Sequence, residues 1–203
     1  MRKHVLNIQE YGASESDSQS QARRSKALKI VNIVLSVVIV LLIIAIILFT
    51  TTLTLIGVKG ESMMPNLIEG DKLVLLKWGY SLDYGDIVVF RKDKENEEGE
   101  EVIVKRVVAK GGDVISFDTS TMKWIRNGEE VEESYFKGEY NNDYFTSILP
   151  ELTADGITVE EGHIFVLGDN RSIPKGWSND SHIYGAIPQD TVMGKVIKVI
   201  SNG

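Results

Sequence analysis

Ser62 is the residue of this sequence best placed to act as a nucleophile. It lies in Gly60–Asn66, a segment with the composition of a turn. A serine in a turn that follows an extended segment can present its hydroxyl and its backbone N–H together, and acyl transfer uses both, as nucleophile and as oxyanion donor. Taken alone this signal is not specific, because most Ser-x-x-Pro segments are simple turns.

Lys105 is the candidate base, and it lies in the apolar run Val102–Val108. Period-2 alternation in a strand places Lys105 and Arg106 on opposite faces. A lysine accepts a proton near neutral pH only if burial lowers its pKa. The structural alternative is an edge-strand lysine whose amine reaches water, and Lys195 and Lys198 occupy similar strands, so the apolar flanks alone do not single out Lys105.

The residue types present in the sequence limit which other catalytic mechanisms are possible. The sequence has no cysteine, which excludes disulfides, thiolate metal sites and cysteine nucleophiles. His4 precedes the long apolar segment, so a serine–histidine–acid triad beyond that segment would have to draw on His163 or His182. No metal ion and no cofactor are expected.

A membrane anchor is predicted at residues 30–50, because no charged residue occurs between Lys29 and Lys59 and roughly 20 apolar residues span a bilayer. Residues 1–29 are expected to form a disordered basic tail, with six basic and three acidic side chains. By the positive-inside rule this tail is cytoplasmic and residues 51–203 are extracytoplasmic. The overall net charge of −7 leaves −10 for the remainder, which argues against a nucleic-acid partner.

The fold predicted for residues 51–203 is mainly β, an antiparallel sheet domain that follows the single transmembrane helix. Short runs rich in β-branched residues are separated by glycine, asparagine and charged clusters. The predicted strands are Lys72–Leu76, Asp86–Phe90, Val102–Ala109, Asp113–Phe117, Ile164–Leu167 and Val192–Ile200. Residues 118–160 are more polar and less regular, and we expect them to form a small inserted cap.

Five segments follow one another along the sequence: Ser62–Pro65, Gly85–Phe90, Lys105–Val108, Gly168–Arg171 and Ser178–Ser181. Together they resemble the successive motifs of bacterial type I signal peptidases, which are serine–lysine proteases. The resemblance implies that Ser62 is the nucleophile and Lys105 the general base. It further implies that Ser178 hydrogen-bonds the lysine amine and that Arg106 and Asp169 form a supporting ion pair.

This chain departs from the family pattern at several positions. Some members use a serine hydroxyl as oxyanion donor where this chain has Gly60, so the Gly60 backbone N–H is the expected second donor. Asn66 stands where many members have threonine. The segment Ser172–Trp177 is an insertion, and His182 replaces the arginine that usually partners the aspartate at Asp180.

A substrate preference follows if the segment before Ser62 is extended, because Ile56, Val58 and Gly60 would then share its face. With Val104 and Leu67, which match pocket positions in the family, they would form shallow apolar pockets for small residues one and three places before the cut. This is the pattern at the end of a secretory signal peptide. The expected partners are signal peptides of secretory preproteins, the lipid bilayer and, by proximity, the export machinery.

Two other functions stay open at the level of sequence. A self-cleaving repressor-type protease would share the serine–lysine chemistry, but it requires a DNA-binding domain where this chain has its apolar segment. A catalytically inactive, membrane-anchored extracellular β-domain that binds surface proteins would have no need of Ser62 and Lys105 together.

The predicted topology can be tested with protease added outside intact protoplasts. Because the basic cluster Arg23–Lys29 should remain in the cytoplasm, we expect the protease to digest residues after Thr51 and to spare the N-terminal tail. Immunoblotting against each end of the chain measures this. A protected C-terminal domain would contradict the orientation.

Overall fold

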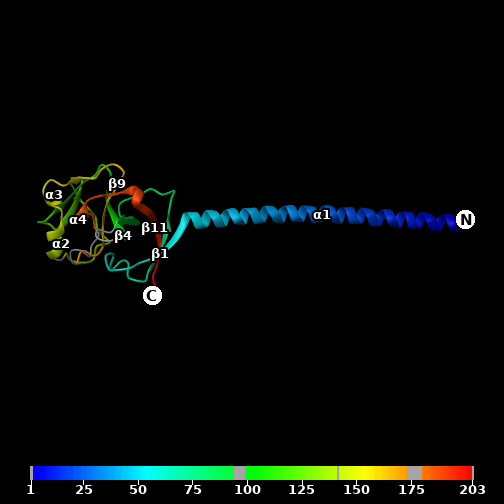
Figure 1. Ribbon diagram of the computed structural model, residues 1–203, viewed down its shortest axis with the longest axis horizontal. Helices are drawn as coiled ribbons and strands as arrows, with labels where there is room; N and C mark the ends of the chain where they lie inside the picture. Colours follow the sequence, from blue (N-terminus) through cyan, green and yellow to red (C-terminus); the bar gives the residue numbers. More distant parts are fainter. Residues whose placement is uncertain (1, 94–98, 141, 173–179, 203) are drawn as a thin grey trace. The chain divides into compact units, whose positions relative to one another are not determined.

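The computed structural model describes residues 2–93, 99–140, 142–172 and 180–202 (Figure 1). The chain divides into two compact units, Met1–Thr50 and Thr51–Gly203. The elements are α1 (Arg2–Thr52), β1 (Leu53–Gly57), β2 (Lys72–Leu76), β3 (Ile87–Asp93), β4 (Glu100–Lys110), β5 (Val114–Asp118), β6 (Lys123–Arg126), β7 (Glu129–Glu130), α2 (Asn142–Ser147), α3 (Pro150–Thr153), β8 (Ile157–Thr158), β9 (His163–Leu167), α4 (Ser181–Tyr184), β10 (Ile187–Pro188), the 3-10 helix η1 (Gln189–Thr191) and β11 (Val192–Ile200).

The N-terminal unit is helical. Within α1, Arg23–Thr52 is the helix of the described residues that is long and apolar enough to cross a membrane, and its apolar side chains are exposed rather than packed against protein. Residues 2–29 are also helical, where the sequence predicted a disordered tail. The tail contains no proline, and extending an existing helix requires no new nucleus.

The second unit is built around a seven-stranded antiparallel sheet, which confirms the predicted mainly β fold. Its strand order is β1-β2-β11-β3-β4-β9-β10. Each of the six predicted strands is present, within a few residues of its predicted ends. Alternation along β3 places Val88 and Phe90 in one apolar cluster and Val89 in another, so both faces of the sheet are covered.

A four-stranded sheet of order β7-β6-β5-β8 forms the smaller layer. Trp124 and Phe117 fill its core, and Tyr144 of α2 and Leu152 of α3 pack against them. In Figure 1, α2 and α3 lie at the end of this unit away from β1 and β11. This layer contains strands from the predicted cap, residues 118–160, but it begins earlier, with β5, because β5 pairs with β6 and β8 rather than with the main sheet.

Strand β4 is longer than either of its neighbours in the main sheet. One edge pairs with β3 from Glu100 to Arg106, whereas the other edge pairs with β9 only from Arg106 onward. Among the described residues no strand pairs with the second edge of residues 100–105. Lys105 thus lies at the last position before that edge is covered.

Candidate active site

The turn that carries Ser62 is anchored by the side chains that follow it. Met63 and Leu67 are buried in the apolar cluster over β1 and β2, whereas Ser62 itself is half-buried. The Leu67 N–H donates to the Met63 carbonyl at 2.9 Å, which closes the turn. Packing of the two apolar side chains therefore directs the serine away from the core.

A glycine and an asparagine hold the backbone of this turn from the other side. The Asn170 N–H donates to the Ser62 carbonyl at 3.0 Å, and the Asn170 side chain donates to the Glu61 carbonyl at 3.0 Å. A Cβ on Gly168 would lie 2.5 Å from the Ser62 carbonyl oxygen. Only glycine allows this approach, so the segment after β9 fixes where Ser62 stands.

Lys105 is buried, with 1% of its surface exposed. It lies opposite Val88 of β3, and its Nζ is 3.4 Å from the Asp180 Oδ1. Burial lowers the pKa of Lys105, and the Asp180 carboxylate offsets only part of that shift. The predicted buried environment of this lysine is therefore present, and its amine does not reach water as that of an edge-strand lysine would.

The predicted ion pair between Arg106 and Asp169 is present. The Arg106 Nε donates to the Asp169 Oδ1 at 2.8 Å, and a second guanidinium nitrogen contacts Oδ2. A third bond, from the same guanidinium to the Gly85 carbonyl at 2.7 Å, ties the pair to the start of β3. Asn66 donates to the Asp169 Oδ2 at 2.8 Å and to the Tyr135 carbonyl at 2.8 Å, so it connects the serine turn with both layers.

Asp180 is fully buried between Lys105 and His182. Burial by itself raises the pKa of Asp180, but the charge of Lys105 and the contact with His182 outweigh it and lower the pKa overall. The carboxyl group is therefore ionised. Ser178, the predicted hydrogen-bond partner of Lys105, lies outside the described residues, as do residues 173–177 of the insertion.

Ser62 and Lys105 open into one groove of about 780 Å³. Four of the predicted substrate or oxyanion residues also line it: Ile56, Val58, Gly60 and Val104. Leu67 does not line it, because its side chain is packed inside the core. The expected extended segment stops early, since β1 ends at Gly57 and Gly60 has a φ of +78°.

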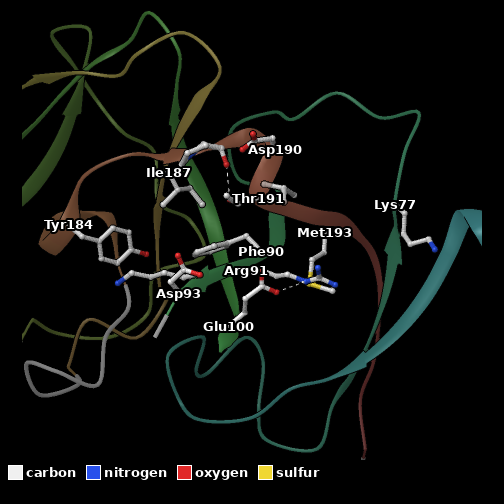
Figure 2. A pocket seen from close by; sticks show the side chains of 13 residues that line it. Lys77, Phe90, Arg91, Asp93, Glu100, Tyr184, Ile187, Asp190, Thr191 and Met193 are labelled. Atoms are coloured by element: carbon white, nitrogen blue, oxygen red, sulfur yellow. Dashed lines mark hydrogen bonds and ion pairs between the residues drawn. The ribbon is translucent and has the colours of Figure 1, made fainter. Parts of the chain in front are cut away.

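A second hollow of about 690 Å³ lies between β3, β11 and η1 (Figure 2). Phe90 and Ile187 line it together with charged side chains such as those of Arg91 and Glu100, which form an ion pair of 3.5 Å. The Thr191 hydroxyl donates to the Pro188 carbonyl at 2.7 Å. Neither Ser62 nor Lys105 lines this hollow, so it is not the candidate active site.

Arg171 has a structural role that the sequence did not predict, although it ends the motif Gly168–Arg171. Its side chain is buried and donates to the Gly168 carbonyl at 2.7 Å and to the Tyr140 hydroxyl at 2.9 Å, and it pairs with Glu133. Arg171 therefore links the segment that holds Ser62 to the smaller layer. Its position next to Asp169 and Asn170 is the signal in the sequence that points to a structural role. The neighbouring residues do not predict that its side chain is buried.

The comparisons with known proteins agree with this geometry. The family model described as signal peptidase, peptidase S26, matches residues 30–200. Signal peptidase IB of Staphylococcus aureus is 33% identical over 152 residues, which cover 68% of this chain and 73% of that protein. A probable signal peptidase I-1 of Synechocystis sp. is 29% identical over 147 residues, covering 69% and 67%.

The chain belongs to the signal peptidase family, peptidase S26. It is accordingly a serine peptidase, and its N-terminal apolar helix fits a membrane anchor. The family predicted from the spaced motifs is confirmed.

The approach of Gly168 to Ser62 predicts the effect of Gly168→Ala. The added Cβ must displace the Ser62 backbone, so we expect a loss of roughly 1–3 kcal/mol in the free energy of unfolding and a lower rate of peptide cleavage. Gly138→Ala is the matched control, because its Cβ would make an ordinary 3.5 Å contact with Phe136. Thermal unfolding and turnover measure both, and equal behaviour of the two variants would contradict the constraint.

Proposed function

We propose that this chain is a membrane-anchored endopeptidase that removes signal peptides from exported preproteins, with Ser62 as nucleophile and Lys105 as general base. The observation that supports it best is that a buried lysine, whose pKa is lowered by that burial, lines the same groove as a half-buried serine. A lysine in this state can be neutral and accept a proton. The two histidines outside the N-terminal unit, His163 and His182, do not line the groove.

The reaction begins when the Ser62 Oγ attacks the carbonyl carbon of the scissile bond and the Lys105 Nζ takes the hydroxyl proton. The developing oxyanion accepts hydrogen bonds from the backbone N–H groups of Ser62 and Gly60. Lys105 then gives its proton to the leaving amine as the C–N bond breaks. A water molecule, deprotonated by Lys105, then attacks the acyl carbon. The ester bond to Ser62 breaks, the acyl group leaves as a carboxylic acid, and Lys105 returns the proton to the Ser62 Oγ.

The other site residues position these two. Asp180 contacts the Lys105 amine. Arg106 pairs with Asp169, which accepts a hydrogen bond from Asn66, so β4 is held in place next to the serine turn. Ser178 remains our proposed second partner of the lysine amine. None of these side chains needs to exchange a proton with the substrate.

The open edge of β4 provides a place for an extended peptide. Residues 100–105 offer backbone groups on an edge that no described strand covers, and an extended peptide can pair with such an edge. Ile56, Val58 and Val104 line the same groove and leave shallow apolar space that admits small side chains. We propose that the end of a signal peptide binds there, on the outer side of the bilayer and near the export machinery.

The catalytically inactive alternative makes a different demand on the molecule. A binding module gains nothing from burying an amine, because desolvation of a charged lysine is unfavourable and Asp180 offsets it only in part. Activity toward a preprotein decides between the two functions, and persistent absence of cleavage under active conditions would favour the alternative.

For the nucleophile, we expect Ser62→Ala to leave the melting temperature unchanged and to lower the cleavage rate at least roughly a thousandfold. The hydroxyl carries the covalent step, whereas a half-buried turn serine contributes little to packing. Cleavage of a preprotein in liposomes, followed by gel, measures it. His163→Ala should cleave at close to the wild-type rate, and the assignment fails if Ser62→Ala does the same.

For the base, we expect Lys105→Arg to stop cleavage, because an arginine does not release its proton at working pH. The wild-type rate should rise with pH through an apparent ionisation below about 10.4, since only the neutral amine accepts the serine proton and burial lowers its pKa.

Because Lys105 is buried, the larger arginine can also destabilise the fold, so the melting temperature of the variant is measured alongside its rate. The wild-type pH profile tests the base independently of any variant. A rate that is flat from pH 6 to 10, or near-normal cleavage by Lys105→Arg, would remove Lys105 from the mechanism.

A further inference from the structure

His182 belongs to a fully buried polar cluster that the proposed reaction does not use directly. Its ring stacks on Tyr144 of α2, with centroids 4.1 Å apart. Nε2 lies 3.1 Å from the Ser147 Oγ, and Nδ1 lies 3.6 Å from the Asp180 Oδ2. The residue is 0% exposed, so the ring does not contact bulk solvent.

The hydrogen bonds of Ser147 indicate where the ring protons lie. The Ser147 hydroxyl donates to the Tyr144 carbonyl at 2.7 Å, so it offers only a lone pair to His182. The Nε2 of His182 is therefore the donor in the bond to Ser147. Nδ1, which has no hydrogen-bond partner among the described residues, then faces the Asp180 carboxylate.

Two states of His182 are compatible with this arrangement, and they differ in the interaction at Nδ1. In the neutral ring a lone pair points at a carboxylate, which is repulsive in a buried site. In the doubly protonated ring an N–H points at it, and a charge-assisted contact replaces the repulsion. The geometry favours the imidazolium.

The charge of Asp180 couples this choice to Lys105. Asp180 lies 3.4 Å from the Lys105 Nζ on one side and 3.6 Å from His182 on the other, and all three side chains are at most 2% exposed. A buried carboxylate requires a positive partner. If His182 is neutral, the Lys105 ammonium is the one cation among the described residues that contacts the carboxylate, and an ammonium is not a base.

We propose that His182 is a positioning residue for the candidate active site: its imidazolium balances the Asp180 carboxylate and so allows Lys105 to be neutral. Asp180 is balanced by one positive charge, which is either on the Lys105 amine or on the His182 ring. The enzyme can react when the charge is on His182, because Lys105 is then neutral. This role rests on the function proposed above, with Lys105 as the base.

The neighbours leave His182 as the cation available for this role among the described residues. Arg171, whose guanidinium carbon is 6.0 Å from the Tyr144 ring, is already paired with Glu133. The other titratable groups near the cluster are phenols or carboxylates, and none of these supplies a positive charge. They are Tyr144 of α2, Tyr184 of α4, and Asp169 and Glu101, which act on Lys105.

Two substitutions at His182 separate charge from packing. His182→Arg supplies a permanent cation, whereas His182→Gln keeps a side chain of similar size with donors but no charge. We expect the ionisation of Lys105 to occur at the lowest pH in His182→Arg and the highest in His182→Gln, with the wild type between them. Removal of the positive charge of His182 should raise the pH at which Lys105 loses its proton by at least about one unit. This corresponds to a tenfold change in rate at fixed pH.

The titration of Lys105 is measured by NMR through its side-chain carbon shifts in the full chain in detergent, with Ser62→Ala in the background to prevent self-digestion. Lys105→Arg assigns the signal. This readout does not depend on turnover, so it remains informative even if the wild type cleaves no preprotein. The pH–rate profile of the same variants with Ser62 intact should shift in the same order. His163→Gln, on β9 and outside the groove, is the matched control and should leave the ionisation unchanged.

The outcomes are distinct. If His182→Gln raises the pH at which Lys105 loses its proton and the control does not, the charge-balancing role is supported. If that pH is unchanged or lower in folded His182→Gln, the proposal is overturned. Should His182→Arg fail to fold, the 15N shifts of the His182 ring in the Ser62→Ala protein decide: two protonated nitrogens at neutral pH support the proposal, and a neutral ring overturns it.

Discussion

The burial of one amine is the constraint on which the rest of this site depends. Lys105 lies inside the domain at 1% exposure, where desolvation disfavours its charged form, while Asp180 at 3.4 Å favours it. The two effects oppose each other, and burial prevails. A contact that balances the Asp180 carboxylate therefore also changes the pKa of Lys105, and His182 makes such a contact, at 3.6 Å, without lining the groove.

The serine depends on the same few residues by a different route. The segment after β9 donates a hydrogen bond to the Ser62 carbonyl, carries Asp169 to its pair with Arg106, and is itself tied to the smaller layer by Arg171. The smaller layer thus supports the turn that carries Ser62 without lining the groove. The smaller layer has its own aromatic core, in which Phe117 packs against Trp124 with ring centroids 5.0 Å apart.

The groove itself is a consequence of strand length. β4 extends beyond the reach of β9, so one stretch of its edge stays open beside Lys105. The β1 segment and the serine turn form the other wall. An extended peptide can pair with such an open strand edge, which satisfies its backbone groups. In the binding mode that we propose, the side chains that line the walls of the groove then select the substrate.

The sequence alone determined the class of fold, five strands of the main sheet and one of the smaller sheet, the apolar helix and the family, because each depends on local periodicity or on motifs that are contiguous in the chain. It also paired Arg106 with Asp169 correctly through the family resemblance. Only the tertiary structure decided that Lys105 is buried while similar lysines such as Lys195 are not, that β5 belongs to the smaller sheet, and that Leu67 supports the core instead of the groove. Each of these is a matter of which distant segments pack together, and the desolvation of Lys105 or the charge balance around Asp180 is a property of that packing, which no run of neighbouring residues encodes.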